Sequence, residues 1–127
     1  MGEILLIAAD WQLRALVRAQ LLEEGFEVRA LPTLETALAH LVHGGEQPRL
    51  TILDTQDVGI EARAVRDLWR LTGEAPLLLC GNALGQASLG QEGMPPARLL
   101  LRPFRVGDVV QEVRRMLACL ENDVWAE

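Results

Sequence analysis

The most reactive group in the sequence is a carboxylate at the end of an apolar run. In the segment LTILDTQDVG (50–59), Leu50, Ile52 and Leu53 lead directly into Asp54. Such a run is typical of a buried strand, so Asp54 falls where that strand meets a loop. A carboxylate at this position either is a reactive group at the edge of a sheet, able to bind a cation or take part in group transfer, or only begins the loop.

The elements that would position Asp54 alternate along the whole chain. Short apolar runs predict strands at 4–9, 26–31, 49–54, 75–80 and 97–101. Apolar residues at helical spacing predict helices at 10–25, 33–45, 60–72 and 105–122. Thr33 is suited to cap the second of these helices. Residues 81–96 contain four glycines and two prolines, which predicts at most a short helix there.

This alternation predicts an α/β fold of the three-layer (βα)5, flavodoxin-like type, a doubly wound parallel sheet with helices on both faces. In such sheets the functional cleft lies at the carboxyl ends of the strands. Five segments are predicted to meet there: 8–10, Leu31, 54–57, 80–82 and 101–104. Asp54 therefore shares its edge of the sheet with several other strand ends.

Length and composition are those of a single globular domain. The chain has 127 residues, of which 50% are hydrophobic and 24% charged, enough for one core. Its net charge of −6 would repel phosphate backbones, so no direct binding of nucleic acid is expected. All twelve basic residues are arginines.

No segment of the sequence directs the chain to a membrane. No apolar run approaches the roughly 18 residues that a membrane-spanning helix needs, and no basic region precedes the first apolar run, as it would in a signal peptide. We therefore expect a cytoplasmic protein without a membrane partner. Cys80 and Cys119 lack the spacing of a metal site or a disulfide framework, so both are expected to be free and buried.

Several features together resemble the receiver domain of two-component response regulators. They are the (βα)5 alternation at this length, the first-helix run LRALVRAQLLEEGFEV, the strand LTILD, and RPF after the fifth strand. The resemblance runs from about Glu3 to Leu120 and implies the strand order 2-1-3-4-5. It implies a receiver-like domain at 1–121, with 122–127 as a tail or the start of a linker to an output domain.

The resemblance implies a chemistry for the candidate cleft. Receiver domains carry two acids after the first strand, a phosphoaccepting Asp after the third, a Thr or Ser after the fourth, and Lys-Pro after the fifth. Together these groups bind Mg²⁺ and transfer a phosphoryl group to the Asp, often from a histidine kinase. Asp54 matches the phosphoacceptor, and Arg102 with Pro103 occupies the Lys-Pro position. Arginine keeps the positive charge and can bind phosphate through two donors, so Arg102 is a candidate phosphate contact, but its side chain is longer than that of lysine and planar.

The remaining positions depart from the receiver pattern. Ala8 and Ala9 stand where the two acids belong, and Asp10 comes one residue late. Asp10 either slips into an acid position or caps the first helix, a role that aspartate favours. A Mg²⁺ ion would then have Asp54, Asp10 and a backbone carbonyl near Gln56 as ligands, so we expect either no cofactor or weakly bound Mg²⁺.

The groups that would contact a phosphoryl group and report its presence are also altered. Gly81 occupies the hydroxyl position, and the amide of Asn82 is a candidate phosphate contact one residue later. Leu99 replaces the aromatic residue that usually accompanies switching. Trp11 lies at the mouth of the predicted site, where it either plugs the cleft or is a partly buried first-turn residue.

These departures favour a degenerate receiver: a non-enzymatic signalling module that acts through a protein partner, such as a histidine kinase or another signalling protein. One alternative is a receiver still phosphorylated at Asp54 in a phosphorelay. A lesser one is a flavodoxin-like cofactor-binding protein or small enzyme, although no GxGxxG or Walker loop is present. The side chain of Trp11 or Arg102 within about 3 Å of the Asp54 carboxylate, the range of a hydrogen bond, would favour the degenerate form.

The last predicted helix carries charges on its outer face. These are Arg105, Glu112, Arg114 and Arg115. In receiver domains the surface that includes the fifth strand and the last helix often forms dimers, so the resemblance implies a possible homodimer through this surface. A solvated charged face is the alternative.

Overall fold

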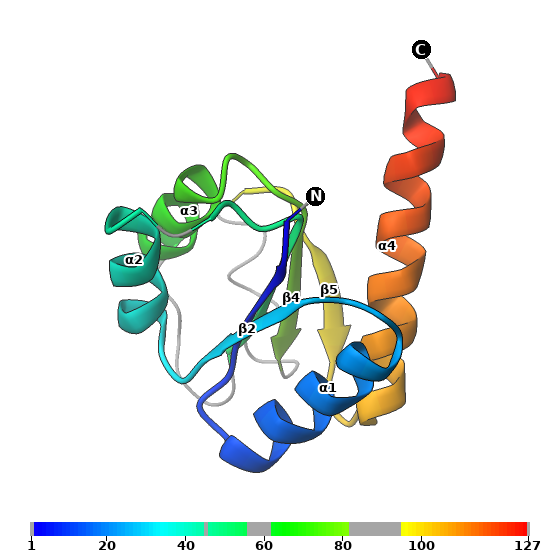
Figure 1. Cartoon of the computed structure of the whole chain (residues 1–127), viewed down its shortest axis with the longest axis horizontal. Coiled ribbons are helices and arrows are strands. Elements are labelled where there is room, and N and C mark those ends of the chain that lie inside the picture. The colour runs from blue at the N-terminus through cyan, green and yellow to red at the C-terminus, as the bar shows by residue number, and fades with distance from the viewer. Residues whose placement is uncertain (1, 45, 56–61, 82–94, 127) are drawn as a thin grey trace.

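The apolar runs of the sequence form the central sheet of the computed structural model (Figure 1), which describes residues 2–44, 46–55, 62–81 and 95–126. The sheet has five strands in the order β2-β1-β3-β4-β5, and every neighbouring pair is parallel. The predicted fold class and strand order are therefore confirmed. The strands are β1 (Ile4–Ile7), β2 (Val28–Leu31), β3 (Leu50–Asp54), β4 (Leu77–Gly81) and β5 (Arg98–Leu101).

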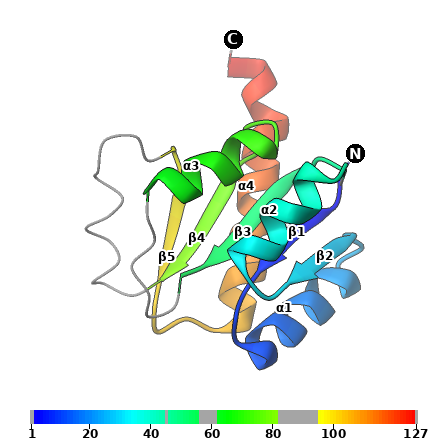
Figure 2. The ribbon, with the colours of Figure 1, turned by 90° about the vertical axis from the view of Figure 1, so that its left-hand side faces the viewer.

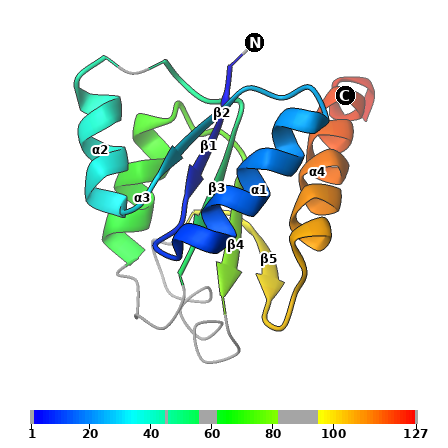
Figure 3. The same cartoon turned by 60° about the horizontal axis from the view of Figure 1, so that its bottom comes forward.

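Helices cover both faces of the sheet (Figures 2 and 3). In the part of the chain that the structure describes, they are α1 (Trp11–Glu23), α2 (Leu34–Val42), α3 (Ala62–Leu71) and α4 (Val106–Ala126). The weak helix predicted within 81–96 falls almost wholly on residues 82–94, outside the described residues. Among the described helices, none combines the length and the apolar character needed to cross a lipid bilayer.

The alternation of side chains along each strand divides the core in two. One half lies between the sheet and helices α1 and α4, and the other between the sheet and helices α2 and α3. In β3, Ile52 belongs to the α1/α4 half and Leu53 to the α2/α3 half. Because side chains alternate with a period of two, Asp54 follows Ile52 toward the α1/α4 face.

The helix α2 begins at the cap that the sequence predicts. Thr33 caps this helix, since its hydroxyl accepts from the backbone N–H of Thr36 at 3.1 Å and the Thr36 hydroxyl accepts from the backbone N–H of Thr33. This reciprocal arrangement satisfies two N–H groups that a helix start would otherwise leave unpaired.

Two predictions at the C-terminal end were wrong. The helix α4 does not end near residue 122 but continues to Ala126, and it extends away from the sheet (Figure 1). No glycine or proline occurs after Gly107, so nothing in the sequence interrupts the helix. Cys80 is buried as predicted, but Cys119 is exposed. Cys119 lies two residues past the buried Leu117, which turns it by about 200° to the outer side of the helix.

Candidate functional site

The carboxyl ends of β3, β4 and β5 form the candidate site. Asp54 is the last residue of β3 and pairs in register with Cys80 on β4. Gly81 pairs with Leu101 at the end of β5, so Arg102 follows directly from this edge. The parallel register therefore brings three segments far apart in the sequence to one edge of the sheet.

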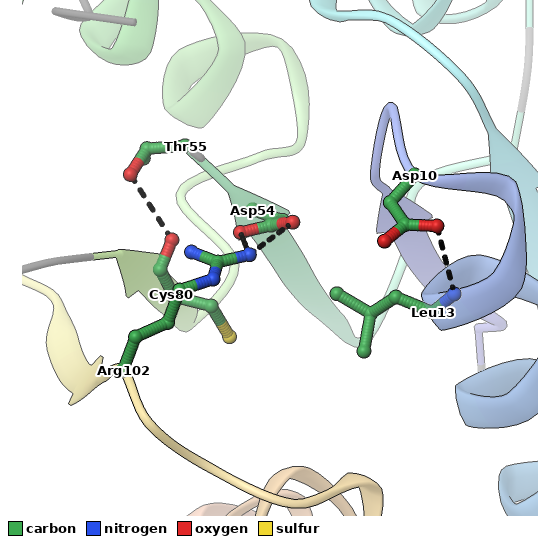
Figure 4. A network of polar contacts seen from close by, with 6 residues as sticks. All are labelled: Asp10, Leu13, Asp54, Thr55, Cys80 and Arg102. Carbon is green, nitrogen blue, oxygen red and sulfur yellow. Dashed lines mark hydrogen bonds and ion pairs between the residues drawn. The ribbon is translucent and has the colours of Figure 1, made fainter. Parts of the chain in front are cut away.

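Arg102 holds the carboxylate of Asp54. Its Nη2 donates to Oδ1 at 2.7 Å and to Oδ2 at 2.8 Å (Figure 4). The side chain of Asp54 is only 2% exposed, whereas that of Arg102 is 30% exposed. The guanidinium also lies over the ring of Phe104, 5.1 Å from its centroid, a cation–π distance. Arg102 thus meets the hydrogen-bond criterion that favours a degenerate site.

The buried thiol of Cys80 lies within the field of this ion pair. The pKa of Cys80 is raised from an ordinary 9.0 to about 12, chiefly by burial and next by the negative charge of Asp54, while the positive charge of Arg102 partly offsets both. Burial and a neighbouring negative charge disfavour the thiolate, whereas a neighbouring positive charge favours it. Cys80 is therefore a neutral part of the core beside the pair and is not a nucleophile.

At the end of β1, an arginine interacts with the backbone where receiver domains have two acids. Ala8 is 1% exposed and presents only its carbonyl. The Arg14 Nη1 donates to the carbonyl of Ala8 at 2.6 Å and more weakly to that of Ala9 at 3.4 Å. The contact of Arg14 with the strand end was not predicted, because the sequence gives no sign of which way its long side chain turns.

Asp10 caps α1. Its Oδ1 accepts from the backbone N–H of Gln12 at 2.9 Å and of Leu13 at 3.4 Å, so the capping alternative is confirmed. Asp10 also lines an open hollow of about 500 Å³ together with Leu13, Arg102, Pro103 and Phe104. Figure 4 shows the carboxylate of Asp10 beside the first turn of α1, apart from the bonds that join Arg102 to Asp54.

A threonine that the sequence did not single out lies against Gly81, the residue at the hydroxyl position. Gly81 has no side chain, and a Cβ built there would lie 2.5 Å from Thr55 Oγ1. The hydroxyl of Thr55 donates to the carbonyl of Cys80 at 3.1 Å. The only sequence signal was a threonine directly after Asp54, and its contact with residue 81 depends on the register of β3 and β4.

The other predicted site residues have different outcomes. Leu99 packs as an apolar side chain against the α2/α3 half of the core. Trp11 is 66% exposed and does not plug the site. Gln56 and Asn82 lie outside the described residues, so their proposed roles stay predictions.

The described residues do not fit a Mg²⁺ ion, which needs several oxygen ligands. Both oxygens of Asp54 accept from a cationic guanidinium, and an oxygen of Asp10 accepts two backbone N–H groups. The carbonyls of Ala8 and Ala9 accept from Arg14. No group of three or more His, Cys, Asp or Glu side chains with metal-binding geometry occurs among these described residues. Cationic arginine side chains thus take up oxygen atoms that a divalent ion would need.

Solved structures have the same architecture. A response regulator receiver protein from Sinorhizobium medicae WSM419 superposes with a TM-score of 0.73 at 21% identity, covering 92% of this chain and 94% of that chain. A CheY-like response regulator receiver domain protein from Methanospirillum hungatei JF-1 gives 0.75 at 15% identity, covering 97% and 98%. Adenylate cyclase from Rhodopirellula baltica gives 0.74 at 16% identity, covering 99% and 98%.

No protein-family model matches the sequence, and no curated protein matches it. At identities of 15–21%, the likeness to solved structures concerns the fold. The resemblance drawn from the sequence is confirmed at that level, since the chain has the fold of response regulator receiver domains.

Proposed function

We propose that this chain, which has the fold of a response regulator receiver domain, is a degenerate receiver: a non-enzymatic signalling module that binds a protein partner without a phosphorylation cycle. One observation carries the proposal. The carboxylate at the phosphoacceptor position is 2% exposed, and both of its oxygens accept hydrogen bonds from Arg102.

The chemistry of phosphoryl transfer explains why this contact matters. A carboxylate attacks phosphorus with an oxygen lone pair, and a cation such as Mg²⁺ must neutralise the charge of the incoming phosphoryl group. For Asp54 to react, Arg102 would have to withdraw and leave a nearly buried carboxylate without this partner. Removing this cation from a nearly buried carboxylate is costly. The resting arrangement therefore opposes both Mg²⁺ binding and attack.

Exposed apolar side chains on α1 support a role in protein binding. Three large ones are exposed along this helix, with Trp11 66%, Leu16 55% and Leu22 41% exposed. Tryptophan is among the residues that contribute most to protein interfaces. A signalling partner, such as a histidine kinase, would cover these side chains without needing access to Asp54.

The alternative is a receiver that is still phosphorylated at Asp54. It is favoured by Arg102, because a guanidinium at this position could move from the carboxylate to the oxygens of an attached phosphoryl group. In that case the ion pair would be a resting state and not a permanent one.

Intact-mass measurement separates the two. The protein is incubated with acetyl phosphate and Mg²⁺, with Asp54→Asn as the matched control. We expect no adduct in either protein. An increase of about 80 Da, roughly the mass of one phosphoryl group, that forms in the unsubstituted protein and is lost in Asp54→Asn would overturn the proposal in favour of the alternative.

Self-association is a separate proposal for the β5/α4 surface. Glu112 of α4 pairs within the chain with Arg98 at 2.8 Å and with Arg115 at 3.1 Å. We propose that a second copy could bind by exchanging these pairs across an interface. Light scattering at low and high salt tests this, because exposed ion pairs weaken as salt is raised. A mass that equals one chain at both salt concentrations would contradict a homodimer.

A further inference from the structure

Thr55 and Gly81 are complementary in shape although 26 positions separate them. The hydroxyl of Thr55 occupies the space directly above Gly81, 2.5 Å from where a Cβ would stand, a distance that no real contact of this kind tolerates. The Cβ of Thr55 itself is 3.9 Å from that point, an ordinary van der Waals distance. The conflict is therefore with the hydroxyl oxygen and not with the rest of the threonine.

The same hydroxyl ties the end of β3 to the end of β4. The backbone N–H of Thr55 donates to the carbonyl of Cys80 at 2.7 Å, and its hydroxyl donates to the same carbonyl at 3.1 Å (Figure 4). The next carbonyl along β4, that of Gly81, accepts from the backbone N–H of Arg102 at 2.6 Å. Thr55, which follows β3, and Arg102, which follows β5, thus donate to the carbonyls of two consecutive residues of β4.

These contacts close a ring around the ion pair. Asp54 is followed in the chain by Thr55, which donates hydrogen bonds to the carbonyl of Cys80. Cys80 is followed by Gly81, whose carbonyl accepts from the backbone N–H of Arg102, and the guanidinium of Arg102 in turn donates to Asp54. The backbone N–H of Thr55 already makes the link to Cys80, and its hydroxyl adds a second bond to the same carbonyl. The absence of a side chain at position 81 leaves the space that this hydroxyl occupies. Arg102 reaches across the end of β4, so the position of that strand end sets whether its Nη2 meets both oxygens.

We infer that Thr55 is the positioning residue of the Asp54–Arg102 pair. Its side chain takes the space of the side chain absent from Gly81 and fixes the ends of β3 and β4 so that Arg102 is held on Asp54. This inference rests on the proposed function, because it explains how the pair is kept closed.

The first test is a double-mutant cycle between positions 55 and 81, read by urea unfolding. We expect Gly81→Ala to raise the equilibrium constant for unfolding by about 10-fold or more in the unsubstituted chain, because overpacking destabilises the folded state. In a Thr55→Ala background the same change should cost about 3-fold or less, since the new methyl group then meets only ordinary contacts. Equal losses in both backgrounds would overturn the inference.

The second test reads the ion pair itself. The coupling between Asp54 and Arg102 is measured with Asp54→Asn and Arg102→Gln, alone and combined, in three backgrounds: Thr55, Thr55→Ser and Thr55→Val. Serine keeps the hydroxyl, whereas valine keeps the shape without it. We expect the coupling to fall by about 3-fold or more in Thr55→Val and to persist in Thr55→Ser.

The outcomes distinguish this inference from the proposed function. A coupling that is the same in Thr55 and Thr55→Val would show that Thr55 contributes only to general stability and would overturn the inference alone. Absence of any Asp54–Arg102 coupling in the unsubstituted chain would overturn the proposed function, whatever the cycle between positions 55 and 81 gives. Neither test uses phosphorylation, so a phosphoryl adduct at Asp54 is a separate result.

Discussion

Arg102 reaches Asp54 across the end of the strand that separates them. Asp54 ends β3, Arg102 follows β5, and β4 lies between the two strands in the sheet. The distances of 2.7 and 2.8 Å from Nη2 to the two carboxylate oxygens make this contact a charge-assisted hydrogen bond at a nearly buried acid. The negative charge of Asp54 is consequently balanced by the positive charge of Arg102 in the same chain.

Removing the guanidinium should destabilise the fold. In Arg102→Gln, Asp54 would lose its cationic partner, so we expect the free energy of unfolding to fall by about 1–3 kcal/mol, less than for a fully buried pair because Arg102 is partly exposed. Arg105→Gln, at an exposed position, is the matched control and should change it by less than about 0.5 kcal/mol. Equal effects of the two substitutions in urea unfolding would contradict a stabilising role for the pair.

Magnesium should have little effect on the unsubstituted protein. Because Arg102 occupies both oxygens of Asp54, we expect millimolar Mg²⁺ to leave the thermal midpoint unchanged. In Arg102→Ala the carboxylate loses its cation, and Mg²⁺ should then raise the midpoint, with Arg102→Ala/Asp54→Asn as the control that abolishes the rise. A clear rise in the unsubstituted protein would show that the arginine yields to the metal.

Asp10 should behave as a helix cap and not as a metal ligand. Asp10→Ala removes the acceptor for two backbone N–H groups, so we expect a loss of about 1 kcal/mol of stability. Asparagine caps as well as aspartate, and Asp10→Asn should therefore restore most of that loss. If Asp10→Asn were as harmful as Asp10→Ala, the negative charge would matter and the capping role would be insufficient.

The sequence predicts the fold well because the fold depends on patterns that need no tertiary information. The buried runs of β1 and β4 contain no charged or hydroxyl side chain, β3 is apolar except for Thr51 and the terminal Asp54, and Thr33 begins its helix as its residue type predicts. The position of Asp54 at a strand end follows from the same pattern. The extent of α4 was underestimated, because the absence of helix breakers after Gly107 is a weaker signal than a clear cap.

The contacts within the site were less predictable, because they depend on where long or polar side chains turn. The sequence left Arg102 open as a candidate phosphate contact or as a partner of Asp54, and the structure shows the second. Thr55 meets Gly81 only because the parallel register pairs Asp54 with Cys80 and sets the next residues side by side. Such distances cannot be obtained from strand order alone. The exposure of Cys119, by contrast, could have been predicted from the phase of the apolar stripe on its helix.

The two cysteines should differ sharply in reactivity. Cys80 is 2% exposed and its raised pKa keeps it a thiol, whereas Cys119 is exposed. With a disulfide reagent at neutral pH, we expect one fast-reacting thiol and one that reacts at least about 100-fold more slowly, after unfolding of the core. Cys119→Ser should remove the fast phase. A fast phase that persists in Cys119→Ser would show that the β4 strand end opens readily.

The pH dependence of stability at alkaline pH should report Cys80. Burial, with the charge of Asp54, raises the pKa of this thiol from 9.0 to about 12 in the folded chain, so ionisation occurs first in the unfolded state. The stabilisation is complete below pH 9 and is lost as pH rises toward 12, at about 1.4 kcal/mol per pH unit for one proton. The sequence has no lysine and no tyrosine, and arginines stay charged throughout this range, so few other side chains obscure the effect.

Unfolding in urea at a series of pH values, in a Cys119→Ser background, measures this slope. We expect Cys80→Ala to be less stable at neutral pH, because it loses buried volume, but to show a smaller decline between pH 9 and 11. The difference between the two slopes isolates the thiol from the general cost of the substitution. Parallel declines in the two proteins would mean that Cys80 ionises as easily in the folded chain as in the unfolded one, contrary to its place beside the Asp54–Arg102 pair.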